Sequence, residues 1–299
     1  MTIFGQIVLG PPGSGKTKYC SIMQEYLQTL GRKAYVVNLD PANDRLTYDC
    51  QLNIFDLINI EDVMINCNLG PNGGLVYCME FLEANIDWLV ENLKDICKKS
   101  SEENTYLLFD FPGQVELYTH HNSVKNIIQK LTKLDYRLCC VNLVDSYYVS
   151  DPAKFISVLL MSLSTMLQIE LPHVNILSKM DLINQYGKLA FSLDFYTDVM
   201  DLSYLCETLE GDNILKKFKK LNEKICDVVS DFSLLSFVPL NIQLKSNVIR
   251  CIQCIDRANG YIYGNMDNMD IMNSIGGDID MQEEQDDVLR QFSNNQEDY

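Results

Sequence analysis

The sequence predicts an α/β fold in which a mostly parallel β-sheet is covered by helices on both faces. Short apolar runs alternate with longer segments whose apolar residues recur every three or four positions, and this alternation is typical of buried strands and amphipathic helices. A glycine-rich loop joins the first such strand to the first helix. Hydrophobic residues make up 47 % of the 299 residues, which is ordinary globular usage.

Six strands are expected along the chain. Each is a short apolar run, and the first four end at a Gly, Pro or Asp that favours a turn. The predicted strands are residues 3–9, 34–39, 106–111, 138–144, 174–177 and 236–240.

Helices are expected between these strands. In the first, the apolar residues keep helical spacing from Tyr19 to Leu30, and Gly31 follows as the residue that ends the helix. The predicted helices are residues 19–30, 85–97, 122–134, 153–169 and 246–259, with a further helical region after residue 181.

No membrane partner or transmembrane helix is expected. The longest apolar stretch, from Phe155 to Leu167, is interrupted by serine and threonine and is shorter than a membrane span. The first ten residues lack the basic segment of a secretory signal. The eleven cysteines therefore indicate reduced thiols in a cytoplasmic protein. Cys251 and Cys254 form a lone CxxC without a second ligand pair, so we expect them to pack in the core.

The net charge of −17 disfavours direct nucleic-acid binding. The charge is concentrated in residues 264–299, which hold ten acids and one base and show no apolar periodicity. We therefore predict two regions, a folded domain over residues 1–263 and a disordered acidic C-terminal tail over residues 264–299.

Residues 10–17, GPPGSGKT, match the phosphate-loop pattern G-x-x-x-x-G-K-[ST] between a predicted strand and a predicted helix. Glycines let such a loop curl so that its backbone N–H groups bind phosphate oxygens, a lysine supplies a cation and a hydroxyl binds Mg²⁺. The sequence therefore predicts a P-loop NTPase. The expected nucleotide contacts are Gly13, Ser14, Gly15, Lys16, Thr17 and Lys18.

Acidic and amide side chains follow two other predicted strands. Asp110 begins the segment DFPGQ, and Asp40 follows the strand before it. The carboxyl ends of parallel strands meet at one edge of the sheet, so we expect Thr17, Asp40 and Asp110 to lie near one Mg²⁺. The turn at Gly113 lets the backbone approach the γ-phosphate.

Gln114 is expected to orient the attacking water, with support from Glu116. Asp40 is placed with these residues as part of the catalytic group. His120 and His121 follow closely in sequence, and an exposed helix start explains them equally well.

Residues 178–181, Ser-Lys-Met-Asp, follow the fifth predicted strand and are similar to the guanine-binding signature [N/T]-K-x-D. The Asp181 carboxylate would accept hydrogen bonds from the N1–H and exocyclic amine of guanine, a donor pair that adenine lacks. Lys179 would lay its aliphatic stem along the base. Ser178 and Met180 complete the motif, and the expected ligands are GTP and GDP.

Gly70-Pro71-Asn72, followed by Gly73 and Gly74, indicates only a tight turn when read from its residues. Together with its surroundings, however, it resembles the GPN-loop GTPases. Among the eukaryotic paralogues of that family, the sequence is most similar to the second. The family segments are residues 10–20, 36–43, 69–89, 109–121 and 175–183, and those that favour this paralogue are 151–160, 170–183, 186–205, 236–243 and 258–261. The likeness covers residues 4 to about 263 and leaves out the tail.

The resemblance implies a P-loop GTPase domain with a GPN-loop insertion at about residues 60–84. It implies a homodimer, or a heterodimer with other GPN-loop GTPases, in which Gly70, Pro71 and Asn72 reach the partner's nucleotide and Asn72 contacts the γ-phosphate. It also implies a dimeric switch in the assembly and nuclear import of RNA polymerase II and III, with polymerase subunits as partners and a cytoplasmic protein that shuttles to the nucleus.

Two alternatives stay open. The chain would be a slow or silent GTPase that acts mainly as a GTP-gated assembly platform, or a P-loop kinase that prefers ATP. Turnover measured in isolation separates the first from an active GTPase, and competition between ATP and GTP separates the second.

Overall fold

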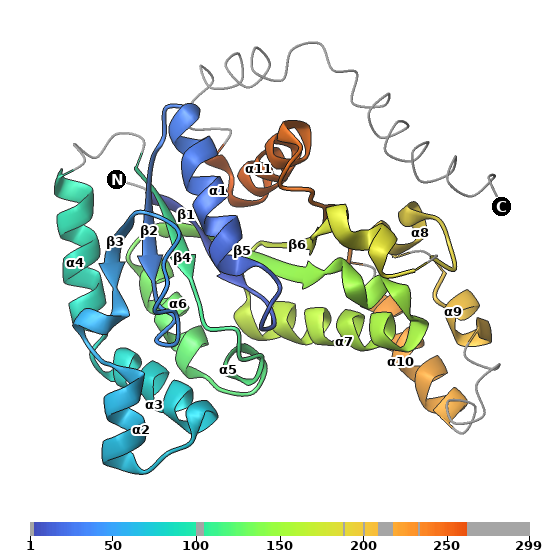
Figure 1. The fold of residues 1–299 in the computed structure, drawn as a ribbon, viewed down its shortest axis with the longest axis horizontal. Coiled ribbons are helices and arrows are strands. Elements are labelled where there is room, and N and C mark those ends of the chain that lie inside the picture. Colours follow the sequence, from blue (N-terminus) through green and yellow to red (C-terminus); the bar gives the residue numbers. More distant parts are fainter. Residues whose placement is uncertain are drawn as a thin grey trace.

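A computed structural model describes residues 3–99, 105–187, 189–199, 201–208, 218–232 and 234–261. Its centre is a seven-stranded sheet in the order β3-β2-β4-β1-β5-β6-β7, and every strand pair is parallel. Figure 1 shows the sheet running through the middle of the molecule, with helices around it. The strands are β1 (Ile3–Leu9), β2 (Lys33–Asn38), β3 (Cys50–Asn53), β4 (Thr105–Asp110), β5 (Tyr136–Asp145), β6 (His173–Ser178) and β7 (Phe237–Pro239).

Helices join most of the parallel strands, as is usual for such crossovers, whereas a loop without a helix joins β2 to β3. The α-helices are α1 (Lys16–Thr29), α2 (Ile60–Cys67), α3 (Pro71–Ala84), α4 (Ile86–Lys99), α5 (Glu116–Thr119), α6 (Ser123–Lys133), α7 (Pro152–Ile169), α8 (Leu193–Thr197), α9 (Ser203–Thr208), α10 (Lys219–Phe232) and α11 (Lys245–Asn259). Three short 3₁₀ helices are η1 (Ile54–Asp56), η2 (Ser146–Ser150) and η3 (Met180–Gln185).

The sheet is buried on both faces because alternate strand side chains point in opposite directions. Val8 and Leu108 pack beneath α1 and α11 on one face. Ile7 and Phe109 pack beneath α4 and α6 on the other. A third cluster joins α7 to β6, β7 and the helices α8, α9 and α10. The predicted α/β architecture with helices on both faces is therefore confirmed.

The six predicted strands and the five predicted helices are all present, with ends that differ by a few residues. Four elements were not expected from the sequence: β3, which is a four-residue edge strand, and the helices α2, α3 and α5. The tight turn read from Gly70–Gly74 alone is wrong, since Pro71 is the first residue of α3 and Gly70 its N-cap. Proline is common at that position because its fixed φ suits a helix and its missing N–H has no helical partner there.

The helix α7 is long and apolar enough to cross a membrane by length and composition, and it is the only one of that kind in the described part of the chain. In this fold its buried side chains, among them Phe155, Leu159 and Leu163, pack in the third cluster. The predicted acidic tail, residues 264–299, lies outside the described residues.

Strand register brings the ends of the central strands to one edge of the sheet. Asp110 pairs with Val8 of β1 and with Asn38 of β2, and Asp145 pairs with Ser178 of β6. Residues that follow these positions therefore share the edge where ligands bind in parallel sheets.

Candidate functional site

The loop between β1 and α1 curls through three glycines. Gly10, Gly13 and Gly15 have φ angles of +142°, +78° and +93°, which side chains disfavour. A Cβ added at Gly10 would lie 2.4 Å from the Leu143 carbonyl oxygen, so the strand-to-loop junction admits only glycine. Because α1 begins at Lys16, its first N–H groups and its positive dipole end face this loop.

Lys16 is buried within the loop it follows. Its Nζ donates to the carbonyl oxygens of Gly10 and Pro11 at 3.0 and 3.3 Å. Burial lowers the pKa of this lysine, and the carboxylates of Asp110 and Asp40 oppose the shift. The ammonium therefore lies over the phosphate loop with acidic side chains nearby. Lys18, two residues on, is exposed on α1.

Thr17 and Asp110 meet at the end of β4. The Thr17 hydroxyl donates to Asp110 Oδ2 at 3.1 Å, and the Tyr48 hydroxyl donates to the same oxygen at 3.0 Å. Burial raises the pKa of Asp110 to about 6, while the bond from Tyr48 and the charge of Lys16 oppose that rise. Asp110 Oδ1 is buried and has no hydrogen-bond partner among the described residues.

This group fits Mg²⁺. A hydroxyl and a carboxylate supply the hard oxygen ligands that Mg²⁺ prefers. Asp110 Oδ1 is buried without a hydrogen-bond partner among the described residues, and it lies at the sheet edge where ligands bind, so it is available to a metal. Asp40 lies at the same edge after β2, where its Oδ1 accepts the Ala42 N–H at 2.9 Å. Burial raises the pKa of Asp40, and the Lys16 charge opposes the shift, so Asp40 belongs to the same electrostatic group.

The segment after β4 covers the phosphate loop. A Cβ added at Gly113 would lie 2.8 Å from Lys16 Nζ and 3.1 Å from Pro12 Cα, so the backbone here approaches the loop closely. Gln114 Oε1 is buried and has no partner among the described residues. Glu116 is exposed at the start of α5.

His120 and His121 lie between α5 and α6, where His120 is exposed and His121 is half-buried, so the explanation by an exposed helix start fits His120 only. His120 caps the end of α5, is exposed, and its Nδ1 lies 2.7 Å from the Thr119 hydroxyl.

The predicted base-binding loop is tied directly to the phosphate loop. The Ser178 hydroxyl lies 2.8 Å from the Ser14 carbonyl oxygen and 3.0 Å from that of Val144, and its one hydrogen is shared between them. Lys179 takes a left-handed φ of +57°, which turns the chain from β6 into η3. Met180 is buried, and Asp181 is exposed at the start of η3, where a base in solution can reach it.

Four contact residues were not assigned to the site from the sequence. Asp145 Oδ2 accepts from Lys179 Nζ at 2.7 Å and so fixes the lysine stem. The Leu240 carbonyl accepts from Met180 N–H at 3.3 Å and holds the same loop from β7. Asn43 and Tyr48 both reach Asp110. Only Asp145 had a usable signal, its place at a predicted strand end.

Gly70, Pro71 and Asn72 do not join this group. They begin α3 and are all exposed. Figure 1 shows α2 and α3 as a lobe at the lower left, apart from the loop that joins β1 to α1. The residues predicted to bind phosphate, metal and base thus lie together in this chain, and the Gly-Pro-Asn segment is not part of that group.

Comparisons with known proteins indicate the family of this chain. A family model described as a conserved hypothetical ATP binding protein matches residues 8–261. GPN-loop GTPase 2 of Danio rerio is 58 % identical over 281 residues, which are 93 % of this chain and 88 % of that protein. GPN-loop GTPase QQT1 of Arabidopsis thaliana is 56 % identical over 266 residues, 89 % of this chain and 88 % of that protein.

The fold also has a solved counterpart. The crystal structure of a GTPase in apo form from Pyrococcus abyssi aligns with a TM-score of 0.63 over 81 % of this chain and 91 % of that chain, at 23 % identity. Since relatives named GPN-loop GTPase match most of the sequence at high identity, the chain belongs to the GPN-loop GTPase family.

Proposed function

We propose that this GTPase binds GTP and GDP together with Mg²⁺ at the edge formed by the ends of β1, β2, β4 and β6. The observation that supports this most is the Ser178 hydroxyl, which holds the guanine-type loop against the Ser14 carbonyl of the phosphate loop. Because the two loops are held together, a purine that hydrogen-bonds to Asp181 and phosphates that contact Lys16 can belong to the same nucleotide.

Each residue has a distinct role in this proposal. Loop N–H groups and Lys16 bind the β- and γ-phosphates, and Thr17, Asp40 and Asp110 hold the metal. Bound Mg²⁺ neutralises charge on the transferring phosphoryl group. Gln114, whose Oε1 is buried and has no hydrogen-bond partner within the described part of the chain, accepts a hydrogen from the attacking water and orients it.

Calorimetry with purified protein and magnesium tests the nucleotide assignment. We expect GTP to bind and ATP to bind more weakly. Lys16→Ala should abolish detectable binding. Asp181→Ala should weaken GTP by about a hundredfold and leave ATP unchanged, because it removes the acceptor of the guanine donor pair. The matched control is Asp227→Ala, an exposed aspartate on α10. ATP binding tighter than GTP would contradict the proposal and favour a kinase.

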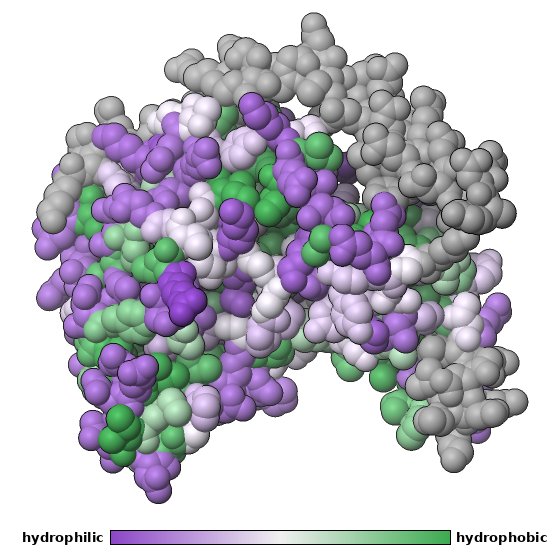
Figure 2. All heavy atoms as spheres, in the orientation of Figure 1, coloured by the Kyte–Doolittle hydropathy of each residue, from purple (hydrophilic) through white to green (hydrophobic). Residues whose placement is uncertain are grey.

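We further propose that the GTPase acts as a dimer in which Asn72 completes the partner's site. Asn72 is exposed at the start of α3, and an amide offers N–H donors without a charge to desolvate. Apolar side chains are exposed on the same lobe, Ile65 at 77 % and Tyr77 at 38 %. Figure 2 shows hydrophobic surface at the tip of this lobe, which suits contact with a second protomer.

Asn72→Ala should slow single-turnover GTP hydrolysis by about a hundredfold and spare GTP affinity, because a donor to the developing charge acts in the transition state. Asn66→Ala, at an exposed position of α2, is the matched control and should keep wild-type turnover. Native mass measurement with a GTP analogue should show a dimer. A monomer with full turnover would contradict the role of Asn72.

The family resemblance also supports a role in the assembly and nuclear import of RNA polymerase II and III, in a cytoplasmic protein that shuttles to the nucleus. Binding of polymerase subunits should then differ between GDP and a non-hydrolysable GTP analogue. Equal binding in both states would contradict this role. Nucleotide-dependent binding with negligible turnover of the isolated protein would instead identify a GTP-gated assembly platform.

A further inference from the structure

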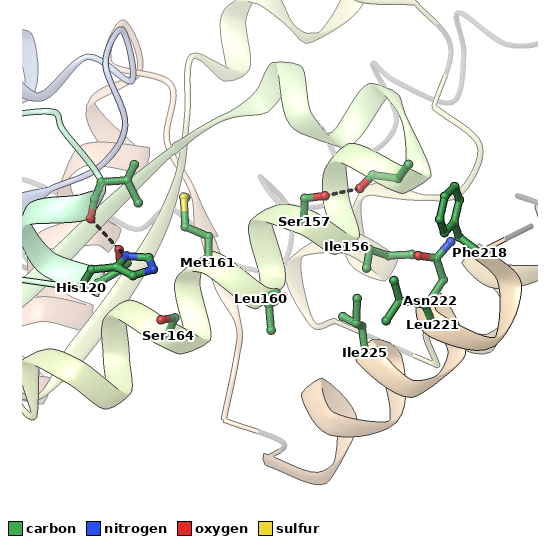
Figure 3. A pocket seen from close by; sticks show the side chains of 13 residues that line it. His120, Ile156, Ser157, Leu160, Met161, Ser164, Phe218, Leu221, Asn222 and Ile225 are labelled. Carbon is green, nitrogen blue, oxygen red and sulfur yellow. Dashed lines mark hydrogen bonds between the residues drawn. The ribbon is translucent and has the colours of Figure 1, made fainter. Parts of the chain in front are cut away.

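An apolar groove of about 480 Å³ lies between α5, α7 and α10, and its lining at the α5 end includes Val115 and His120, which follow Gln114 in the segment after β4. Figure 3 shows Ile156 and Leu160 of α7 on the side of Leu221 and Ile225 of α10, and Met161 on the side of His120. Several side chains at the groove are well exposed to solvent, Leu160 at 41 %, Phe218 at 52 % and Leu221 at 57 %. Exposed apolar side chains that gather at one groove are typical of a contact surface.

We propose that the occupant is a segment of this same chain, residues 281–292, which folds back from the acidic tail onto the groove. The segment reads MQEEQDDVLRQF. The tail as a whole shows no apolar periodicity, but within this short segment Met281, Val288, Leu289 and Phe292 would share one face of a helix formed on the groove. Their separations of seven, one and three residues allow this. The acids Glu283, Asp286 and Asp287 would face away from it.

The chain is long enough for this contact. The described chain ends at Tyr261, which packs edge-on against Phe4 and Tyr106 beside β1. From there to Val288 an extended chain spans about 90 Å, and a domain of this size is only about 50 Å across. Docking in cis is therefore permitted from either side of the molecule.

Charge favours the start of α10 over other parts of the surface. The tail and the rest of the chain are both acidic, so they repel in general. Lys219 and Lys220, however, are both exposed beside Phe218 and Leu221, and Lys219 ion-pairs with Glu223. A segment that carries Glu284 beside its apolar face would meet basic groups at this end of the groove.

Photocrosslinking of the full-length protein tests the proposal. p-Benzoyl-phenylalanine is placed at position 292 in place of Phe292, and crosslinked peptides are mapped by mass spectrometry. We expect crosslinks within one chain to α7 and α10, at a yield independent of protein concentration. The same probe at Tyr299, an aromatic outside the segment, is the matched control and should give about tenfold fewer groove crosslinks, the factor expected when burial of one large apolar side chain is absent.

Groove variants show whether the contact is specific. Leu221→Asp should reduce the crosslinks from position 292 by about tenfold, since a charge would replace an apolar contact. Leu134→Asp, an exposed leucine elsewhere on the surface, should leave them unchanged. Crosslinks between two chains, crosslinks outside α7 and α10, or none at all would overturn docking in cis.

Discussion

Gly113 is the residue at which the switch-like segment after β4 touches the phosphate loop. Its position leaves no room for a Cβ, which would lie 2.8 Å from Lys16 Nζ and 3.1 Å from backbone atoms of Pro12. The lysine can shift, but the loop backbone can shift only by distorting the phosphate cradle.

Gly113→Ala should therefore slow GTP hydrolysis by about ten- to a hundredfold, because a small displacement of a reacting group has an effect of this size. The free energy of unfolding should fall by about 1–3 kcal/mol, as for overpacking. Single-turnover kinetics and urea titration measure the two effects. Gly73→Ala is the control for unfolding, since its Cβ would make only an ordinary contact of 3.5 Å with Leu69. Unchanged turnover in Gly113→Ala would show that this approach does not matter.

Residues with a motif were predictable at this scale, and residues without one were not. Lys16 and Thr17 occupy fixed places in a pattern whose geometry is dictated by phosphate binding. Tyr48 and Asn43 reach Asp110 from the loop between β2 and β3, and no spacing in the sequence signals that contact. Contacts between residues far apart in the sequence depend on the path of the loop in space, and that path is determined by the fold.

At the scale of elements, one buried ion pair joins the end of α1 to α11. The Arg32 guanidinium donates to both carboxylate oxygens of Asp256, and one of these bonds is 2.8 Å long. Both side chains are almost fully buried, and the guanidinium lies 4.0 Å from the centre of the Tyr261 ring. The pair closes the end of the sheet opposite the nucleotide.

Arg32→Ala should lower the free energy of unfolding by about 3–5 kcal/mol, because it leaves the Asp256 carboxylate buried without its partner. Chemical denaturation gives the value. Lys98→Ala, which breaks a pair whose side chains are 69 % and 64 % exposed, should cost less than about 1 kcal/mol. The double variant Arg32→Met with Asp256→Leu should recover most of the loss. Equal small effects for Arg32→Ala and Lys98→Ala would contradict this account.

Elements with a strong period were predictable, and short elements were not. The helices that cover the sheet have one apolar face and were expected from the sequence. By contrast, α2 has only eight residues and packs mainly against α3. The spacing of its apolar residues is therefore set by contact with a neighbouring helix and not by contact with the sheet. Pro71 could have indicated the start of α3, because proline is common at the first position of a helix. The four Gly and Asn residues around it favoured a turn instead.

At the scale of the whole molecule, stability should depend on pH through His173, the first residue of β6. Burial lowers the pKa of this histidine to about 4, and neither ring nitrogen is exposed. In the unfolded chain the pKa is about 6.5. Between these values the unfolded chain binds a proton that the folded protein does not, so acid favours unfolding.

The contribution is complete above pH 6.5 and is lost as the pH falls through 4. The maximum loss from this group is about 3 kcal/mol. Urea titrations from pH 7 to pH 4.5 measure the slope, and His173→Gln should flatten it relative to the wild type. His121→Gln is the matched control at a half-buried site and should keep the wild-type slope. A slope unchanged in His173→Gln would assign the pH dependence to other groups.

The hydroxyl of Ser178 fixes the spacing between two loops. It lies 2.8 Å from the Ser14 carbonyl oxygen, so the loop that begins at Lys179 can move away from the phosphate loop only by losing this hydrogen bond. If the proposed nucleotide binds here, the separation of its purine from its phosphates must match that spacing, and ligands with a longer or shorter connection between the two groups should bind more weakly.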